Sequence, residues 1–346
     1  MEIENIISFL KNYDGEEITL MEVCGTHTAS ICENAIPSII SDKIKLISGP
    51  GCPVCVTPSA YIDKLISLAQ NPKNCIVTFG DMIRVPGSKL ALKDITANGC
   101  RVKMVYTPFE IIELAKNEPD TNFIFAAVGF ETTTPIYALL IEKLICEKIN
   151  NVKLLTALKT MPNAIDTLCK ADSKIDGFIA PGNVSVIIGE KAYSKMAEKY
   201  NLPFVISGFD GKELLATVYA LVKLKNQGKV LNLYSYAVDY NENEKARQIV
   251  NKYFTPCDSA WRGMGIIKNS GMKIRDEYKA FDAGSDGLTA DISQNQACMC
   301  SQIIIGKANP CDCPLYKKIC TPDTPQGACM VSNEGTCFNY YTNNRG

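Results

Sequence analysis

The sequence lacks the features of several large protein classes. Its formal net charge is −1, so nothing in it predicts a surface for nucleic acid or for an anionic membrane. No apolar run approaches the ~20 residues that cross a bilayer, and the acidic N-terminal segment MEIENIISFLKNYDGEE has no signal-peptide pattern. We therefore expect a cytoplasmic protein.

Three common motifs are also missing. There is no Walker loop, which argues against nucleotide binding of the P-loop kind, and no CxxxCxxC signature of radical enzymes. The C-terminal tail has neither a histidine nor a CxxC knuckle, so it does not match a zinc ribbon.

Cysteine is abundant by contrast, with 16 residues in the chain and seven of them between Cys298 and Cys337. Three more, Cys24, Cys52 and Cys55, lie in glycine-rich surroundings near the start. Since structural disulfides are rare in a reducing compartment, clustered cysteines indicate metal or redox chemistry.

Short apolar segments of β type alternate with helical patterns up to about residue 225, which predicts an α/β fold with mainly parallel sheets. We expect strands at 18–23, 45–47, 75–79, 102–106, 122–128, 153–158, 177–179 and 204–206. Helices are expected at 57–71, 107–117 and 190–201.

The two halves of this region look related. ITLMEVCGTHT is similar to FIFAAVGFETT, SGPGCPVCVTPSAYIDKL to IAPGNVSVIIGEKAYSKM, and VTFGD to VISGFD. We therefore predict two related α/β domains over 16–120 and 121–215. Residues 216–346, with an N-terminal helix at 1–15, are expected to form a third, largely helical and irregular, cysteine-rich domain that carries an iron–sulfur cluster.

Ligands of open α/β sheets collect at the carboxyl ends of the strands. The residues that follow expected strands and carry useful chemistry are therefore expected to converge on one cleft; they are Cys24, His27, Cys52, Cys55, Asp81, Glu131 and Asn183.

The segment GPGCPVC precedes an expected helix, with Thr57 as N-cap and Pro58 at the first helical position. A helix N-terminus stabilises a thiolate, so the CxxC spacing of Cys52 and Cys55 indicates a reversible redox pair. Half of a zinc site is the alternative.

The only histidine, His27, follows Cys24 by three residues in MEVCGTHT. Thiolate and imidazole suit iron, zinc or copper, and soft sulfur suits low-spin iron with strong-field ligands. Asp81 and Glu131 are candidate acceptors that orient the imidazole, although each is equally well explained as a cap or loop carboxylate. A buried structural histidine and a cysteine–histidine nucleophile pair are the other interpretations.

The tail CMCSQIIIGKANPCDCPLYKKICTPDTPQGACMVSNEGTC offers thiolates from well-separated loops, which suits a cubane iron–sulfur cluster. The series Cys298, Cys313, Cys320 and Cys337 is one candidate set among the seven cysteines, and a zinc site is the alternative.

These motifs together resemble the HypD family of [NiFe]-hydrogenase maturation factors over essentially the whole chain. The resemblance rests on MEVCGTHT, GPGCPVCV, GFETTTP, PGNVSVIIG and CTPDTPQGACMVSNEGTC. The chain departs from the family at Asn183, where members commonly have histidine, so no metal-ligand role is carried over to that position.

The resemblance implies a scaffold on which iron acquires two cyanides and one carbon monoxide, giving an Fe(CN)2CO centre for the hydrogenase large subunit. The implied partners are a small chaperone, HypC, whose N-terminal cysteine shares the iron, and the cyanide donor HypE. Nucleic acid and membranes are not expected as partners.

The resemblance also implies roles for individual residues. Cys24 would bind the iron with His27 beside it, and Cys52 and Cys55 would form a redox pair. The [4Fe–4S] cluster ligands would be Cys298, Cys313, Cys320 and Cys337. Cys300 and Cys329 would be left for a second disulfide, and Cys311 has no implied role.

Two other functions remain open from the residues. One is an iron–sulfur-dependent disulfide reductase that acts on a protein substrate, which has no need of Cys24 and His27. The other is a zinc-stabilised interaction protein.

Overall fold

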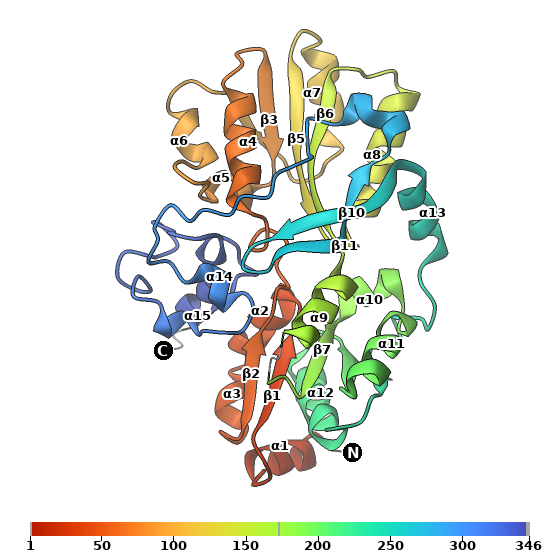
Figure 1. The fold of residues 1–346 in the computed structure, drawn as a ribbon, viewed down its shortest axis with the longest axis vertical. Coiled ribbons are helices and arrows are strands. Elements are labelled where there is room, and N and C mark those ends of the chain that lie inside the picture. The colour runs from red at the N-terminus through yellow and green to blue at the C-terminus, as the bar shows by residue number, and fades with distance from the viewer. Residues whose placement is uncertain (1, 172–173, 344–346) are drawn as a thin grey trace.

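The computed structural model describes residues 2–171 and 174–343, so Met1 and the last three residues of the predicted third domain lie outside it. Two sheets lie one above the other in Figure 1. Sheet one has the order β2 (Ile44–Ser48), β1 (Ile18–Glu22), β7 (Gly177–Pro181), β8 (Phe204–Ser207) and β9 (Val230–Asn232). Sheet two has the order β10 (Phe254–Trp261), β11 (Gly265–Ile274), β6 (Val152–Lys159), β5 (Asn122–Gly129), β3 (Asn74–Thr78) and β4 (Val102–Met104).

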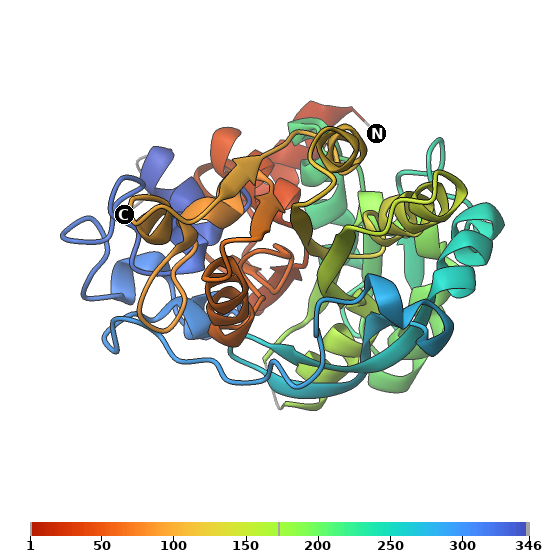
Figure 2. The same cartoon turned by 90° about the horizontal axis from the view of Figure 1, so that it is seen from above.

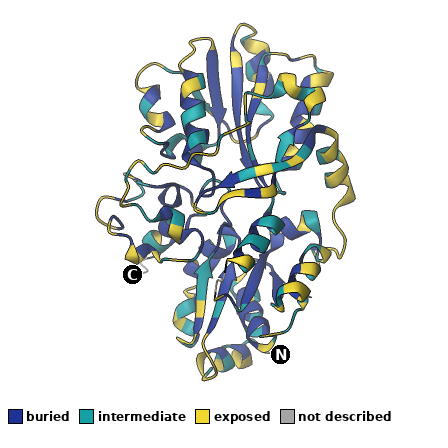
Figure 3. Cartoon of the chain, viewed as in Figure 1, coloured by how far each residue is buried: buried dark blue, intermediate teal, exposed yellow. Residues whose placement is uncertain are grey.

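All strand pairs of sheet one are parallel, as are those among β3, β4, β5 and β6 of sheet two. The strands β3, β7 and β8 are buried along their whole length, as expected for parallel strands with helices on both faces. Figure 3 shows this buried interior, with exposed residues on the outer helices and loops. The α/β prediction with mainly parallel sheets is confirmed.

Helices cover both sheets. Those associated with sheet one are α1 (Ile3–Lys11), α2 (Gly25–Glu33), α3 (Ile36–Ile39), α9 (Met161–Lys170), α10 (Gly182–Ile188), α11 (Lys191–Tyr200) and α12 (Gly211–Lys223). Those associated with sheet two are α4 (Ser59–Ala69), α5 (Gly80–Arg84), α6 (Leu92–Thr96), α7 (Glu110–Asn117), α8 (Thr134–Cys146) and α13 (Glu244–Tyr253). All eight expected strands and all three expected helices are present. No helix within the described residues is both long and apolar enough to cross a membrane.

The chain crosses between the sheets three times, after β2, after β6 and after β9. Each of the predicted ranges 16–120 and 121–215 contributes two strands to each sheet. The first four strands of sheet one have the order β2-β1-β7-β8, and four strands of sheet two have the order β6-β5-β3-β4. The first order becomes the second when each of β1 to β4 is replaced by its counterpart among β5 to β8, and the reverse. The strand orders of the two sheets are therefore equivalent, but neither half of the chain forms a sheet of its own.

Two segments of the predicted third domain belong elsewhere. The β10–β11 hairpin is antiparallel and extends sheet two by pairing with β6, although residues after 216 were expected to be helical or irregular. The N-terminal helix α1 packs against α12 and α3 beside sheet one, because Ile6 and Leu10 enter the same core cluster as Leu214.

The cysteine-rich tail forms little regular structure. Its elements are η1 (Asp276–Phe281), α14 (Cys300–Ile303), η2 (Pro310–Asp312), η3 (Ala328–Met330) and α15 (Thr336–Thr342). Both Figure 1 and Figure 2 show the C-terminal region on one side of the molecule, with α13 on the other. α15 packs against α2, so the tail lies next to the loop that follows β1.

Candidate functional site

Cys24 lies between β1 and α2, as the sequence predicted, and is the N-cap of that helix. Its backbone N–H donates to Glu22 Oε2 at 2.9 Å, and the residue is 8% exposed. Burial raises the pKa of the Cys24 thiol to about 12, while the backbone N–H groups of His27 and Thr26 act in the opposite direction. The site therefore holds a protonated thiol that an added positive charge would convert to thiolate.

His27 is fully buried in α2, and its ring packs against Phe209 with centroids 4.8 Å apart and the ring planes tilted by 33°. Nε2 lies 2.9 Å from the Gly208 carbonyl oxygen at the end of β8, while Nδ1 is buried with no hydrogen-bond partner in the described chain. Burial lowers the pKa of His27 to about 4, so the imidazole is neutral. Nε2 then carries the proton that it donates to the carbonyl, and Nδ1 keeps a free lone pair.

The expected acceptors for His27 lie elsewhere. Glu131, after β5, accepts the Met161 N–H at 2.7 Å through Oε1 and thereby caps α9. Its Oε2 is buried without a partner in the described residues, and burial raises the pKa of Glu131 to about 7. The Gly208 carbonyl, not Glu131 or Asp81, is the group that orients His27.

Asp81 lies instead near Glu334 of the tail, since its charge contributes to a raised pKa of that carboxyl group. Asn183 is exposed on α10. Among the described residues, neither Asn183 nor Glu131 has a hydrogen bond to Cys24 or His27.

Cys52 and Cys55 form a disulfide in the loop 49–57, here called the disulfide loop. The following helix α4 begins at Ser59 with Pro58 as its N-cap, one residue later than predicted. The Thr57 hydroxyl is not a cap, because it donates to the Pro53 carbonyl at 2.8 Å within the loop. The predicted position of the cysteine pair just before a helix is correct.

The disulfide loop touches Cys24 directly. Gly25 N–H donates to the Gly51 carbonyl at 3.1 Å. A Cβ atom on Gly51 would collide with the backbone N and Cα of Cys24, so the glycine is required by this close approach. The loops after β1 and β2 therefore bring Cys24 and the cysteine pair together.

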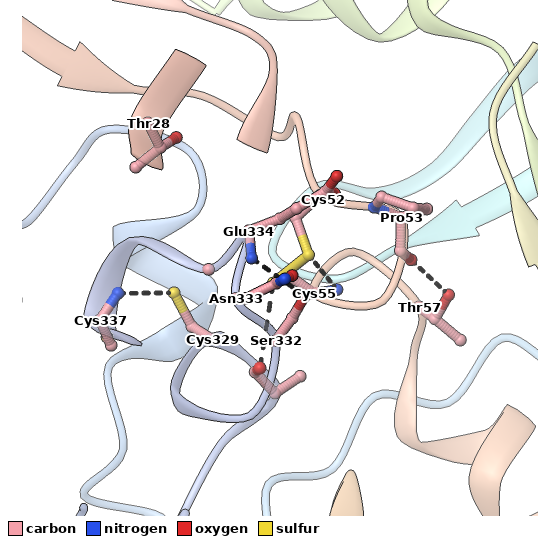
Figure 4. Close-up of a disulfide and its surroundings, with 12 residues drawn as sticks. Thr28, Cys52, Pro53, Cys55, Thr57, Cys329, Ser332, Asn333, Glu334 and Cys337 are labelled. Carbon is pink, nitrogen blue, oxygen red and sulfur yellow. Dashed lines mark hydrogen bonds between the residues drawn. A yellow bond between two sulfur atoms is a disulfide. The ribbon is translucent and has the colours of Figure 1, made fainter. Parts of the chain in front are cut away.

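The tail completes this site. Figure 4 shows the disulfide facing residues 332–334, from the tail segment 326–337. The Cys55 sulfur lies 3.9 Å from the Ala328 carbonyl oxygen, and a small cavity is lined by Thr28, Cys52, Cys55 and Glu334. Burial raises the pKa of Glu334, while a side-chain hydrogen bond with Thr26 acts to lower it. Glu334 was not predicted; its position three residues before Cys337 was the only signal available.

Arg262 is a second residue that sequence reasoning missed. It lies at the tip of the β10–β11 hairpin and is 4% exposed. Its Nε donates to the Cys55 carbonyl at 2.9 Å and its Nη2 to the Thr57 carbonyl at 2.7 Å, while Nη1 pairs with Asp291 at 3.0 Å. The guanidinium therefore holds the backbone of the disulfide loop.

Six cysteines of the tail gather beside this site; all but the half-buried Cys298 are buried, and they are Cys298, Cys300, Cys313, Cys320, Cys329 and Cys337. Burial raises the pKa of Cys298 to about 12, and the neighbouring Cys300, Cys313 and Cys320 add to the effect. The pKa of Cys337 is also raised: a hydrogen bond with Cys329 lowers it, but burial and the neighbouring Cys300, Cys320 and Cys298 raise it. The Gln326 N–H donates to the Cys320 sulfur at 3.4 Å.

This donor set fits a thiolate-bound cluster, because several buried thiols repel one another as anions until a cation is present. Gly327 packs closely against these thiols, since a Cβ atom there would lie 2.9 Å from the Cys298 sulfur. No three His, Cys, Asp or Glu side chains in the described residues are arranged to hold a single metal ion.

The remaining tail cysteines differ in environment. A side-chain hydrogen bond with Cys329 raises the pKa of Cys300, so the two thiols are neighbours, but both are free. Cys329 also accepts the Cys337 N–H at 3.2 Å. Cys311 is exposed.

Known proteins match this chain over nearly its whole length. The family model described as the hydrogenase formation hypA family, HypD, matches residues 2–344. A hydrogenase maturation factor HypD of Azotobacter vinelandii is 38% identical over 348 residues, which cover 94% of this chain and 89% of the relative. The same named factor of Rhodobacter capsulatus is 38% identical over 334 residues, with 94% and 89% covered. A putative hydrogenase expression/formation protein of Methanocaldococcus jannaschii is 38% identical over 330 residues, with 94% and 92% covered.

Proposed function

Because the chain belongs to the HypD family of hydrogenase maturation factors, we propose that it is the scaffold on which the Fe(CN)2CO centre of [NiFe] hydrogenases is assembled. Iron is the substrate, held jointly with a small HypC-like chaperone while cyanide and carbon monoxide are added. A HypE-like protein supplies cyanide, and the hydrogenase large subunit receives the product. The three-domain division stays a prediction.

The observation that carries this proposal is the contact between Cys24 and the disulfide loop. Gly51 lies against the Cys24 backbone, and the tail segment covers the disulfide through Ala328. A metal-binding thiol, a two-electron thiol pair and a cysteine-rich tail therefore share one site.

Cys24 acts as the iron ligand from this chain. The N–H groups at the start of α2 favour its thiolate, and loss of the thiol proton accompanies metal binding. His27 keeps a buried lone pair on Nδ1 and is the second candidate ligand. The remaining coordination positions are left for the chaperone's cysteine and for the incoming diatomic ligands.

Cys298, Cys313, Cys320 and Cys337 would hold a [4Fe–4S] cluster, which supplies single electrons when bound. Reduction of the Cys52–Cys55 disulfide takes two electrons and two protons and yields two thiols. Glu334 lines the same small cavity as both sulfurs, and its raised pKa suits a carboxyl group that passes protons to them. The many free thiols of the described chain fit a reducing, cytoplasmic location.

A disulfide reductase that acts on a protein substrate is the alternative, and Cys24 separates the two functions. We expect Cys24→Ala to abolish the infrared bands of metal-bound cyanide and carbon monoxide in the anaerobic complex with the small chaperone. The cluster's visible absorption should be unchanged, and Cys100→Ala, a cysteine outside the site, should keep all bands. Unchanged bands in Cys24→Ala would favour the reductase.

A further inference from the structure

A cavity of about 160 Å³ lies between sheet two and the segment 285–289 and contains no residue of the Cys24 site. Tyr61 of α4 forms one wall, and the ends of β6, β10 and β11 form another. It is lined by two lysines and a cysteine, Lys159, Lys273 and Cys257, which have no role in the proposed function.

The strand register directs these three side chains to one face. Gly271 of β11 pairs with Lys159 on one side and with Cys257 on the other, and directly paired residues share a face. Lys273, two residues further along β11, lies on that same face. Gly271 has no side chain, and Ser259 packs over it: a Cβ atom on Gly271 would lie 2.7 Å from Ser259 Cβ and 3.2 Å from Ser259 Oγ.

Lys159 carries a buried amino group without a carboxylate partner in the described chain, and its Nζ lies 5.2 Å from the centroid of the Trp261 ring. It is 1% exposed, and its Nζ donates to Ser259 Oγ at 3.0 Å and to the Ala260 carbonyl. In the described chain, no carboxylate lies within 4.0 Å of Lys159 or Lys273. A buried ammonium is costly unless it is paired, so burial lowers the pKa of Lys159 to about 7.

The acidic residues at the cavity are already engaged. Asp258 accepts the Asn269 N–H at 3.0 Å, and Asp286 pairs with Lys279 at 3.0 Å. An ammonium has three N–H donors, of which Lys159 uses two within the protein. Ser259 Oγ accepts one of them, so its own hydroxyl hydrogen is free to donate.

We propose that this cavity binds a small oxyanion, a phosphate or a carboxylate, between the ammonium groups of Lys159 and Lys273, with the Ser259 hydroxyl as a further donor. The anion is the counter-ion that Lys159 lacks. Its binding keeps Lys159 protonated, so one proton is taken up from solvent where the free amine predominates. The other titratable groups that line the cavity are Tyr61, Cys257, Asp258, Lys273 and Asp286, and the charges of Arg262 and Asp291 also act on Lys159.

Calorimetric titration of the anaerobically purified holoprotein with inorganic phosphate, sulfate and acetate tests this proposal. We expect saturable binding that is tighter at pH 6 than at pH 8.5. Comparison of phosphate with acetate distinguishes a tetrahedral ligand from a carboxylate. At pH 8.5, titrations in two buffers of different ionisation enthalpy should reveal proton uptake.

Lys159→Met should weaken binding by about tenfold or more, because it removes a charge-assisted hydrogen bond. Lys273→Met, which lies nearer the surface and leaves the core intact, should weaken it less. Lys195→Met on α11 is the matched control and should bind as the unmodified protein does. Anion-induced stabilisation against heat should follow the same order. Equal affinity of Lys159→Met, Lys273→Met and Lys195→Met, or no binding to the unmodified protein, would overturn the proposal.

Discussion

At the scale of single residues, opposing influences act on the Cys24 sulfur. The helix N–H groups favour the thiolate, whereas burial and the nearby Glu334 and Glu22 carboxyl groups disfavour it. Burial is the largest influence, so the thiol keeps its proton without metal. Under the proposed function, iron supplies the missing positive charge and replaces that proton.

Gly51→Ala tests the contact between Cys24 and the disulfide loop. The new Cβ would meet the Cys24 backbone, which cannot move aside as a flexible side chain can. We expect the free energy of unfolding in urea to fall by about 1 to 3 kcal/mol. Gly80→Ala is the control, since its Cβ would meet only the Met104 sulfur at 3.1 Å. Equal stability of the two variants would contradict the contact.

Glu131→Gln tests the buried carboxyl group. Burial raises the pKa of Glu131 from 4.5 to about 7, so between these values the folded state binds more protons than the unfolded chain. Stability therefore falls as pH rises through this window and is flat above it. The glutamine side-chain oxygen can still accept the Met161 N–H but does not titrate. From pH 4.5 to 7.5, the free energy of unfolding of the variant should therefore fall by about 1 to 3 kcal/mol less than that of the unmodified protein.

Urea unfolding at several pH values measures this difference. Glu113→Gln, an exposed residue of α7, should follow the unmodified protein. If the Glu131→Gln curve ran parallel to that of the unmodified protein, the carboxyl group would not be buried as described.

At the scale of elements, the β10–β11 hairpin joins sheet two to the disulfide loop. Its two strands are paired from Phe254 opposite Ile274 to Trp261 opposite Gly265, so Arg262 lies at the tip. The backbone N–H of Arg262 donates to Val56 at 2.8 Å, in addition to the bonds made by its side chain. The hairpin thus positions the cysteine pair, whereas its own cysteine, Cys257, lines the separate cavity beside Lys159.

Arg262→Met should destabilise the protein by about 2 to 4 kcal/mol, because it leaves two carbonyls and Asp291 without their buried partner. The disulfide should also be reduced faster by dithiothreitol, since its loop loses support. Arg275→Met, which removes a more exposed arginine just after β11, should change both quantities little. A response of Arg262→Met no larger than that of Arg275→Met would refute the positioning role.

At the scale of the whole molecule, the sequence predicted the elements better than their partners. Continuous apolar segments predicted β1 to β8, because buried parallel strands carry apolar residues on both faces. The same pattern does not state which strands pair, so the exchange of strands between the two sheets was not foreseen. Only one of the three pairs of similar segments lies on strands with equivalent positions in the two sheets. In that pair, ITLMEVCGTHT contains β1 and FIFAAVGFETT contains β5.

The site was predicted where chemistry depends on residue type and missed where it depends on tertiary contact. Cys24 and the CxxC pair were recognisable from cysteine in glycine-rich loops after strands. Arg262 and Glu334 carry no such signal, since an arginine or glutamate in an irregular segment is usually exposed. The acceptor for His27 is a backbone carbonyl, which no side-chain pattern reveals.

The most direct measurement is the transfer of electrons from the tail to the Cys52–Cys55 disulfide. Anaerobic holoprotein is reduced by a photochemical one-electron donor that does not itself reduce disulfides. Free thiols are then alkylated and located by mass spectrometry. Cys52 and Cys55 should be labelled in the unmodified protein, in Cys24→Ala and in Cys311→Ser, and should stay unlabelled in Cys320→Ser. Equal labelling in Cys320→Ser would contradict a shared site in which the tail thiols serve the disulfide beside Cys24.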